Sequence, residues 1–165
     1  MIIEMRPATR ADGPKVAEIF LEAFTTTLPS IALAHTPNEC REHFSTTVID
    51  EYEAWVALID GQHAGFFALS AAPDTVTPIG TISDAMLDHL YLRPSYTGCG
   101  IGERCLHLAK YRRPAGLDLW TFQINAGARR FYERHGFTAV YLGDGRDNEE
   151  GEPDVRYAWR PEADR

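Results

Sequence analysis

At 165 residues the chain has the length of one domain with one hydrophobic core, and we expect a single domain over residues 1–165. Its formal net charge of −8 argues against nucleic acid or an anionic membrane as a partner, because either would need a basic face. No run of residues reaches the length of a membrane span or of a signal-peptide core. Because the three cysteines have neither disulfide nor zinc-ligand spacing, we expect free thiols, a cytoplasmic protein and no metal.

The N-terminal part predicts a strand and then a helix. Residues 1–5 favour a short strand that Arg6 and Pro7 close. Asp12 and Pro14 are typical of a helix start, and this helix is expected to end near residues 24–25. Its apolar face at helical spacing is formed by Val16, Ile19, Phe20, Ala23 and Phe24.

The segment 25–40 contains more apolar residues than a solvated loop usually has, and it also holds His35. Its side chains either line a substrate pocket or cover the core, and the sequence leaves both open. A second helix, capped by Thr36 or Asn38, is expected to run to about Val48.

Residues 55–59 and 64–71 predict two antiparallel strands, because Asp60-Gly61 between them suits a tight hairpin turn with positive φ. A loop over 71–84 then leads to a third strand at 87–93, which Pro94 ends. Alternation along this third strand places Asp88, Leu90 and Leu92 on one side and His89 and Tyr91 on the other.

Three glycines at alternate positions, Gly98, Gly100 and Gly102, follow this strand at the entrance of a helix. Glycines allow a sharp turn and a close backbone approach, and the first turn of a helix leaves about four N–H groups without internal partners. Together they favour an anion site for a phosphate, although a tight turn that binds nothing is the alternative. The helix itself is indicated by Ile101, Cys105, Leu108 and Ala109 at helical spacing.

The C-terminal part predicts strand, helix, strand and strand. Residues 117–124 form the first strand, and Asn125 caps a helix over 126–135 that Gly136 ends. Strands at 137–142 and 155–159 then pair across an acidic loop. An antiparallel meander and a βαβ crossover in one small chain indicate an α+β fold, a mixed sheet with helices on both faces.

Two stretches resemble a known family. Residues 90–94, LYLRP, followed by GCGIG at 98–102, resemble the acetyl-coenzyme A signature of the GNAT acetyltransferase superfamily. Residues 125–137, NAGARRFYERHGF, resemble the asparagine, Phe-Tyr and Gly-Phe pattern of the same family. The element order also agrees, so the resemblance covers nearly the whole chain. It implies a mostly antiparallel, α/β-like central sheet of about six to seven strands.

The resemblance also implies the cofactor site, with acetyl-coenzyme A as co-substrate. Main-chain groups of β-strand residues would pair with the pantetheine arm, amides of the glycine turn would hold the pyrophosphate, and Asn125 would contact the arm. Thr97 departs from the family, which usually has Arg or Gln there, so Arg104, Arg129 or Arg130 would have to compensate. The expected cofactor-binding residues are Leu90, Tyr91, Leu92, Thr97, Gly98, Cys99, Gly100, Ile101, Gly102 and Asn125.

The implied reaction is N-acetylation of a primary amine of a small molecule or peptide by direct attack in a ternary complex. Tyr132 would be the general acid, because the family motif places its hydroxyl near the thiolate. Asp88 is the expected base since it shares a strand face with Leu90 and Leu92, whereas His89 has the better pKa but the opposite face.

Weaker substrate contacts are expected from His35 and from Glu149 and Glu150, whose loop is either simply solvated or an acidic rim for a cationic substrate. Nothing pairs Cys99 with a base, which argues against a covalent acetyl-thiol route. The alternative function is a non-catalytic sensor that binds acyl-coenzyme A. A dinucleotide fingerprint fails because Glu103 stands where its third glycine belongs. A homodimer is also expected, because proteins that resemble this chain are commonly dimeric.

Overall fold

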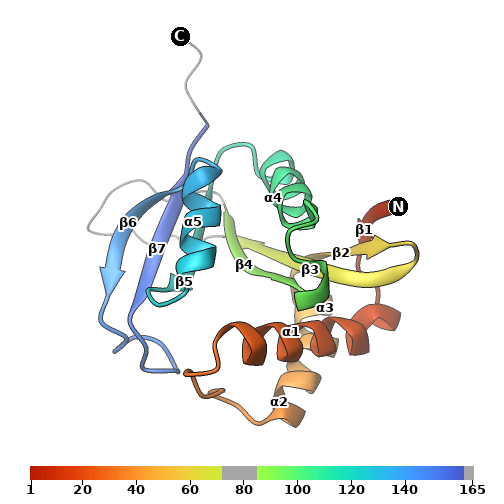
Figure 1. Cartoon of the computed structure of the whole chain (residues 1–165), viewed down its shortest axis with the longest axis horizontal. Helices are drawn as coiled ribbons and strands as arrows, with labels where there is room; N and C mark the ends of the chain where they lie inside the picture. Colours follow the sequence, from red (N-terminus) through yellow and green to blue (C-terminus); the bar gives the residue numbers. More distant parts are fainter. Residues whose placement is uncertain (72–84, 162–165) are drawn as a thin grey trace. The chain divides into compact units, whose positions relative to one another are not determined.

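The computed structural model describes residues 1–71 and 85–161. Among these described residues, seven strands pair in the order β1-β2-β3-β4-β5-β7-β6 (Figure 1). The β1–β2, β2–β3, β5–β7 and β6–β7 pairs are antiparallel and β4–β5 is parallel, which confirms the expected mixed, mostly antiparallel sheet.

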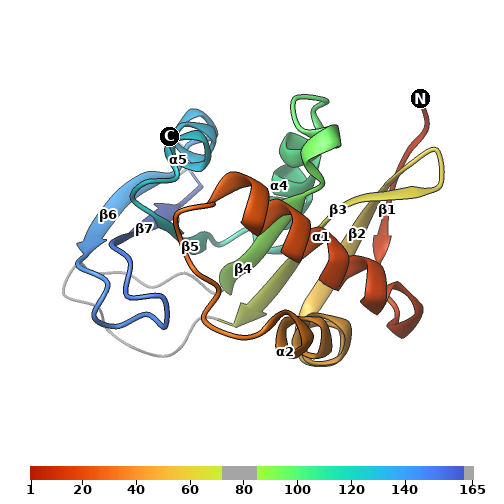
Figure 2. The ribbon, with the colours of Figure 1, turned by 60° about the horizontal axis from the view of Figure 1, so that its bottom comes forward.

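The chain forms two compact units, and the boundaries between them fall at the end of β3, within β4 and within α4. The first consists of Met1–Ser70 and Asp88–Ala109, and the second of Ala71–Leu87 and Lys110–Arg165. In the first unit, Figures 1 and 2 show α1 and α2 on one side of the strands and α4 on the other. The elements that lie wholly or mainly in this unit are β1 Ile3–Pro7, α1 Gly13–Thr27, α2 Pro37–Glu42, α3 Val48–Glu51, β2 Glu53–Ile59, β3 Gln62–Ala71, β4 Ala85–Leu92 and α4 Ile101–Arg112.

The β2–β3 hairpin has the predicted turn. Asp60 and Gly61 have φ angles of 49° and 79°, the left-handed pair that a two-residue type I′ turn requires. Both strands extend slightly beyond the predicted bounds, and β4 begins two residues before the expected Leu87. Most of the loop expected at 71–84 lies outside the described residues.

A buried carboxylate ties β1, the start of α1 and β3 together. Arg6 donates two hydrogen bonds to Asp12, at 2.7 and 2.8 Å, and the Thr9 amide and the His63 ring each lie 2.8 Å from the same carboxylate. The Arg6 hydrogen bonds hold the pKa of Asp12 far below its usual range. The predicted apolar face of α1 is buried, and the helix continues to Thr27, slightly beyond its expected end.

The second helix differs from its prediction. Thr36 caps α2, its hydroxyl oxygen accepting from the Glu39 amide at 3.2 Å, but α2 ends at Glu42. A π-helical turn, His43–Thr47, follows and leads into α3. The hydroxyls of Ser45 and Thr46 donate to backbone carbonyls one turn earlier, at 2.5 and 2.6 Å, a competition that distorts helices.

Aromatic rings fill the space between α1, the π-helical turn and the sheet of the first unit. His89 lies among them, its ring 4.9 Å from Phe44, 6.1 Å from Tyr52 and Tyr91, and 6.4 Å from Phe66 between centroids. Its Nδ1 is buried and has no hydrogen-bond partner among the described residues. Burial, reinforced by the nearby His43, lowers the pKa of His89 to about 4.

We expect His89 to make the fold sensitive to acid. Because its pKa is about 4 in the folded chain and 6.5 for an unperturbed histidine, the unfolded chain binds the proton first as pH falls below about 6.5. The free energy of unfolding should therefore fall by about 3 kcal/mol between pH 6.5 and 4 on this account. Urea titrations at several pH values should show a flatter profile for His89→Phe. His107→Gln, at an exposed site, should retain the wild-type slope, and equal slopes in all three proteins would contradict the assignment.

The second unit is built around β7. It contains β5 Leu117–Phe122, α5 Ala126–Arg134, β6 Thr138–Gly143 and β7 Asp154–Trp159. The predicted pairing of the last two strands is confirmed, and β7 also inserts between β5 and β6, which the sequence did not predict. The parallel contact of β4 with β5 joins Met86 to Asp118.

Asp118 is buried in this unit between two arginines, at 2.5 Å from Arg156 Nη2 and 2.8 Å from Arg160 Nη1. Charged side chains are tolerated in a core only when they are paired. The ion pairs of Asp118 connect β5 to Arg156 of β7 and to Arg160, the residue that follows β7. In the part of the chain that the structure describes, no helix is both long and apolar enough to cross a bilayer.

Candidate functional site

Asp88 lies half-buried on β4, next to Ser70 of β3. The Ser70 hydroxyl donates a hydrogen bond to Asp88 Oδ2. Burial raises the pKa of Asp88, and the hydrogen bonds from Ser70 oppose that rise. A carboxylate with a raised pKa and a fixed orientation has the properties of a general base.

The other β4 side chains follow the expected alternation. Tyr91 packs edge-on against Phe20 of α1 at 5.1 Å and lies 5.8 Å from the Phe66 ring, so its side belongs to the core. Leu90 and Leu92 are half-buried. Gly65 of β3 is needed beside them, because a Cβ there would lie 2.9 Å from the Tyr91 carbonyl oxygen, a main-chain atom.

The glycine turn is exposed and open. Gly98 and Gly100 have φ angles of 78° and 83°, and a Cβ built on either would meet no atom within 4 Å. The Arg104 amide donates to the Gly100 carbonyl at 3.1 Å, so α4 begins directly after the turn with the buried Ile101. Glycine is therefore required here by conformation and not by packing, and the space outside the turn suits a ligand.

Thr97 belongs to the same turn. Its hydroxyl donates to the Pro94 carbonyl at 2.8 Å, so its hydrogen supports the turn itself. Among the three arginines expected to compensate for Thr97, Arg129 donates to the Tyr157 hydroxyl at 3.1 Å in the second unit. Arg104, in the first turn of α4, and Arg130 are exposed.

Cys99 is also exposed, and none of the three cysteines is in a disulfide.

In the second unit, Asn125 caps α5 as expected, its side-chain oxygen accepting from the Ala128 amide at 3.1 Å. Tyr132 is only 8% exposed, and its ring packs 5.5 Å from Phe137 and 6.3 Å from Tyr157. The buried ring therefore has a fixed position on α5.

The weaker substrate candidates are exposed or half-buried. His35 Nδ1 lies 3.5 Å from a carboxylate oxygen of Glu39 in the first unit. Glu149 and Glu150 lie in a second-unit loop that Asn148 closes by donating to the Glu152 carbonyl at 2.7 Å. Asn148 also accepts from the Glu152 amide at 3.2 Å, so its side chain connects the two ends of the segment that carries Glu149 and Glu150.

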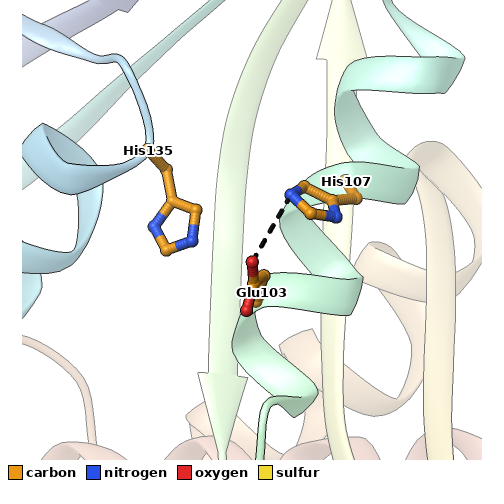
Figure 3. Close-up of side chains that lie close together, drawn as sticks. All are labelled: Glu103, His107 and His135. Atoms are coloured by element: carbon orange, nitrogen blue, oxygen red, sulfur yellow. Dashed lines mark ion pairs between the residues drawn. The ribbon is translucent and has the colours of Figure 1, made fainter.

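Figure 3 shows Glu103 and His107 on successive turns of α4, where they form an exposed ion pair at 3.8 Å. An i,i+4 pair of opposite charges supports a helix by a few tenths of a kcal/mol, and here only in the protonated form of the histidine. His135 belongs to the second unit, where its Nδ1 donates to the Phe131 carbonyl at 2.8 Å.

Sequence reasoning did not single out Ser70 or Arg93. Ser70 lies one strand away from Asp88, and the two residues are 18 positions apart with no periodic pattern that could have connected them. Arg93 has one local signal, its place directly before Pro94 and the glycine turn, but its partners come from α1 and β3.

The chain matches one family model over more than half of its length. The model, described as an acetyltransferase (GNAT) domain, matches residues 50–139. No curated protein sequence matches the chain.

Solved structures share the fold over nearly the whole chain. PaiA N-acetyltransferase from Thermoplasma acidophilum, in complex with coenzyme A, has a TM-score of 0.74 at 21% identity, covering 98% of this chain and 100% of that chain. Apo YjaB from Escherichia coli has 0.72 at 21%, covering 96% and 98%. The ribosomal-protein-S18-alanine N-acetyltransferase from Escherichia coli has 0.73 at 18%, covering 99% and 96%.

Proposed function

The chain belongs to the GNAT acetyltransferase family, and from this premise we propose that it moves the acetyl group of acetyl-coenzyme A to a primary amine. The amine belongs to a small molecule or a peptide, and it attacks the thioester directly in a ternary complex. Residues 1–165 act as one acetyltransferase domain in this proposal.

The glycine turn is the observation that carries the proposal. Two left-handed glycines with open space on the Cβ side expose the main chain at the start of α4. A diphosphate fits such a place, because main-chain amides and the helix dipole both favour negative charge. Amides of residues 98–102 would hold the pyrophosphate, because the Thr97 amide already donates to the Pro94 carbonyl at 3.3 Å. The exposed Arg104 would add a charge-assisted contact worth about 1.5–3 kcal/mol.

Further contacts follow from the family motifs. Main-chain groups of Leu90 and Leu92 would pair with the pantetheine arm as a further strand does, and Asn125 would contact the arm. Tyr91 contributes through its main chain, since its ring is packed in the core.

The acceptor amine must lose a proton before it attacks. An alkylamine with a pKa near 10.4 is almost fully protonated at pH 7, at a cost of about 4–5 kcal/mol. Asp88 would accept that proton directly or through water, while Ser70 fixes its carboxylate. Acetyl-coenzyme A supplies the activated acyl group, and N–H groups of β4 would stabilise the oxyanion.

Tyr132→Phe is expected to lower turnover while leaving cofactor affinity within about twofold, because only the hydroxyl that protonates the departing thiolate is lost. The buried ring keeps its contacts, so the melting temperature should change little. Steady-state rates and coenzyme A titrations measure the two effects separately. Unchanged turnover would remove Tyr132 from the mechanism.

The second candidate is a sensor that binds acyl-coenzyme A without turnover, which the Thr97 departure favours. Incubation with acetyl-coenzyme A and a panel of amines, followed by detection of free thiol, separates the two. Amine-dependent thiol release supports the enzyme, and binding without release on any amine supports the sensor. In the enzyme, His35, Glu149 and Glu150 would contact the amine, and the acidic pair would favour a cationic acceptor.

We further propose that the protein is cytoplasmic, because its three free cysteines agree with a reducing compartment. We also propose a homodimer. This proposal is supported by the position of β6 as an outer strand of the sheet, where Tyr141 and Leu142 are 44% and 62% exposed. Light scattering at several concentrations measures the mass.

A further inference from the structure

Arg93 directly follows the last residue of β4, and its contacts connect the end of this strand to two other elements of the first unit. Its Nε donates to the His63 carbonyl of β3 at 2.9 Å, and its main-chain N donates to the Ala64 carbonyl at 2.8 Å. On α1, its Nη1 donates to Glu22 at 2.7 Å and to Glu18 at 3.3 Å. One side chain thus holds the end of β4 between a strand and a helix.

The Arg93 guanidinium is not placed as a phosphate ligand. Its side chain is only 16% exposed, and two carboxylates already face it. A charge that is paired in this way adds little attraction for an anion outside the turn. Its contribution must therefore be to geometry.

The turn is built directly on Arg93. The Arg93 carbonyl accepts from the Tyr96 amide at 2.9 Å, closing the short helix Pro94–Tyr96. The Thr97 amide then donates to the Pro94 carbonyl at 3.3 Å, and the exposed glycines follow. A displacement of Arg93 would be transmitted through these bonds to the amides of the turn.

We propose that Arg93 is a positioning residue for the diphosphate of coenzyme A: by fixing the base of the turn to α1 and β3, it orders the turn's amides before the ligand arrives. This inference rests on the proposed function, which assigns the diphosphate to the turn. Because Thr97 brings no cationic side chain, binding depends more strongly on amides that are already in place. Ordering them in advance removes an entropic cost of binding.

The test compares coenzyme A with pantetheine, which lacks the diphosphate and the adenosine 3′-phosphate attached to it. Arg93→Met removes the polar contacts but retains an unbranched apolar stem. By calorimetric titration we expect the affinity for coenzyme A to fall about tenfold and that for pantetheine to stay within about twofold. Arg93→Lys, which can still reach Glu22, should recover part of the loss. Glu22→Gln, which leaves Arg93 intact, should show a smaller loss with the same ligand selectivity.

Arg10→Met is the matched control, because Arg10 is also paired with a carboxylate, Asp50, but at the opposite end of α1. It should change neither affinity. Equal losses of affinity for both ligands in Arg93→Met, or no loss of affinity for coenzyme A, would overturn the inference alone. A wild-type protein that binds the two ligands equally would overturn the diphosphate site and the inference with it.

Discussion

Gly100→Glu is expected to abolish coenzyme A binding, with a loss of at least about 100-fold in affinity, because two effects act at one position. At a φ of 83° a side chain strains the turn, which costs about 1–2 kcal/mol. The space beside Gly100 is open, so the new carboxylate would occupy the place proposed for the pyrophosphate and repel it. Calorimetric titration with coenzyme A measures the loss.

Gly61→Glu separates backbone strain from charge. Gly61 has a φ of 79° and equally open surroundings, but it lies in the β2–β3 hairpin of the same unit. This variant should be destabilised to a similar degree and still bind coenzyme A with wild-type affinity. If Gly100→Glu also bound normally, the anion site at the turn would be rejected.

Much of the fold follows from local patterns in the sequence. Asp60-Gly61 predicts its hairpin because few residues other than glycine and asparagine or aspartate accept two successive positive φ angles. The glycines before Ile101 predict the start of α4 for a related reason, since the change from strand to helix needs a backbone that side chains restrict. Gly136, with a φ of 88°, ends α5 in the predicted left-handed conformation.

Features that depend on contacts distant in sequence were missed. The π-helical turn packs closely against the start of α1, since a Cβ on Gly13 would lie 2.4 Å from the Ser45 carbonyl oxygen. The insertion of β7 between β5 and β6 depends on which strands β7 pairs with. The alternation of side chains along β5 or β7 does not determine that pairing. Ser70 and Arg93 were missed for the same reason, since both act through residues on other elements.

Asp88→Asn is expected to lower kcat/KM for the amine by about 10²–10⁴-fold, the usual contribution of a general base. Asparagine is nearly the same size, and its side-chain oxygen can still accept from the Ser70 hydroxyl, so folding should be preserved. In the wild type, activity should fall as pH drops through the raised pKa of Asp88, because the protonated carboxyl cannot accept a proton. This acid limb should disappear in the variant, whereas Asp50→Asn, at a surface ion pair, should retain it.

The acid sensitivity expected from His89 acts in the same direction as the Asp88 titration, so the two effects must be separated. Loss of folded protein would reduce the signal of every variant, including Asp88→Asn, whereas titration of the base affects only proteins that still carry Asp88. Rates should therefore be measured in the His89→Phe background, with the folded fraction followed by circular dichroism at each pH. An acid limb that persists in Asp88→Asn under these conditions would assign the base to another group.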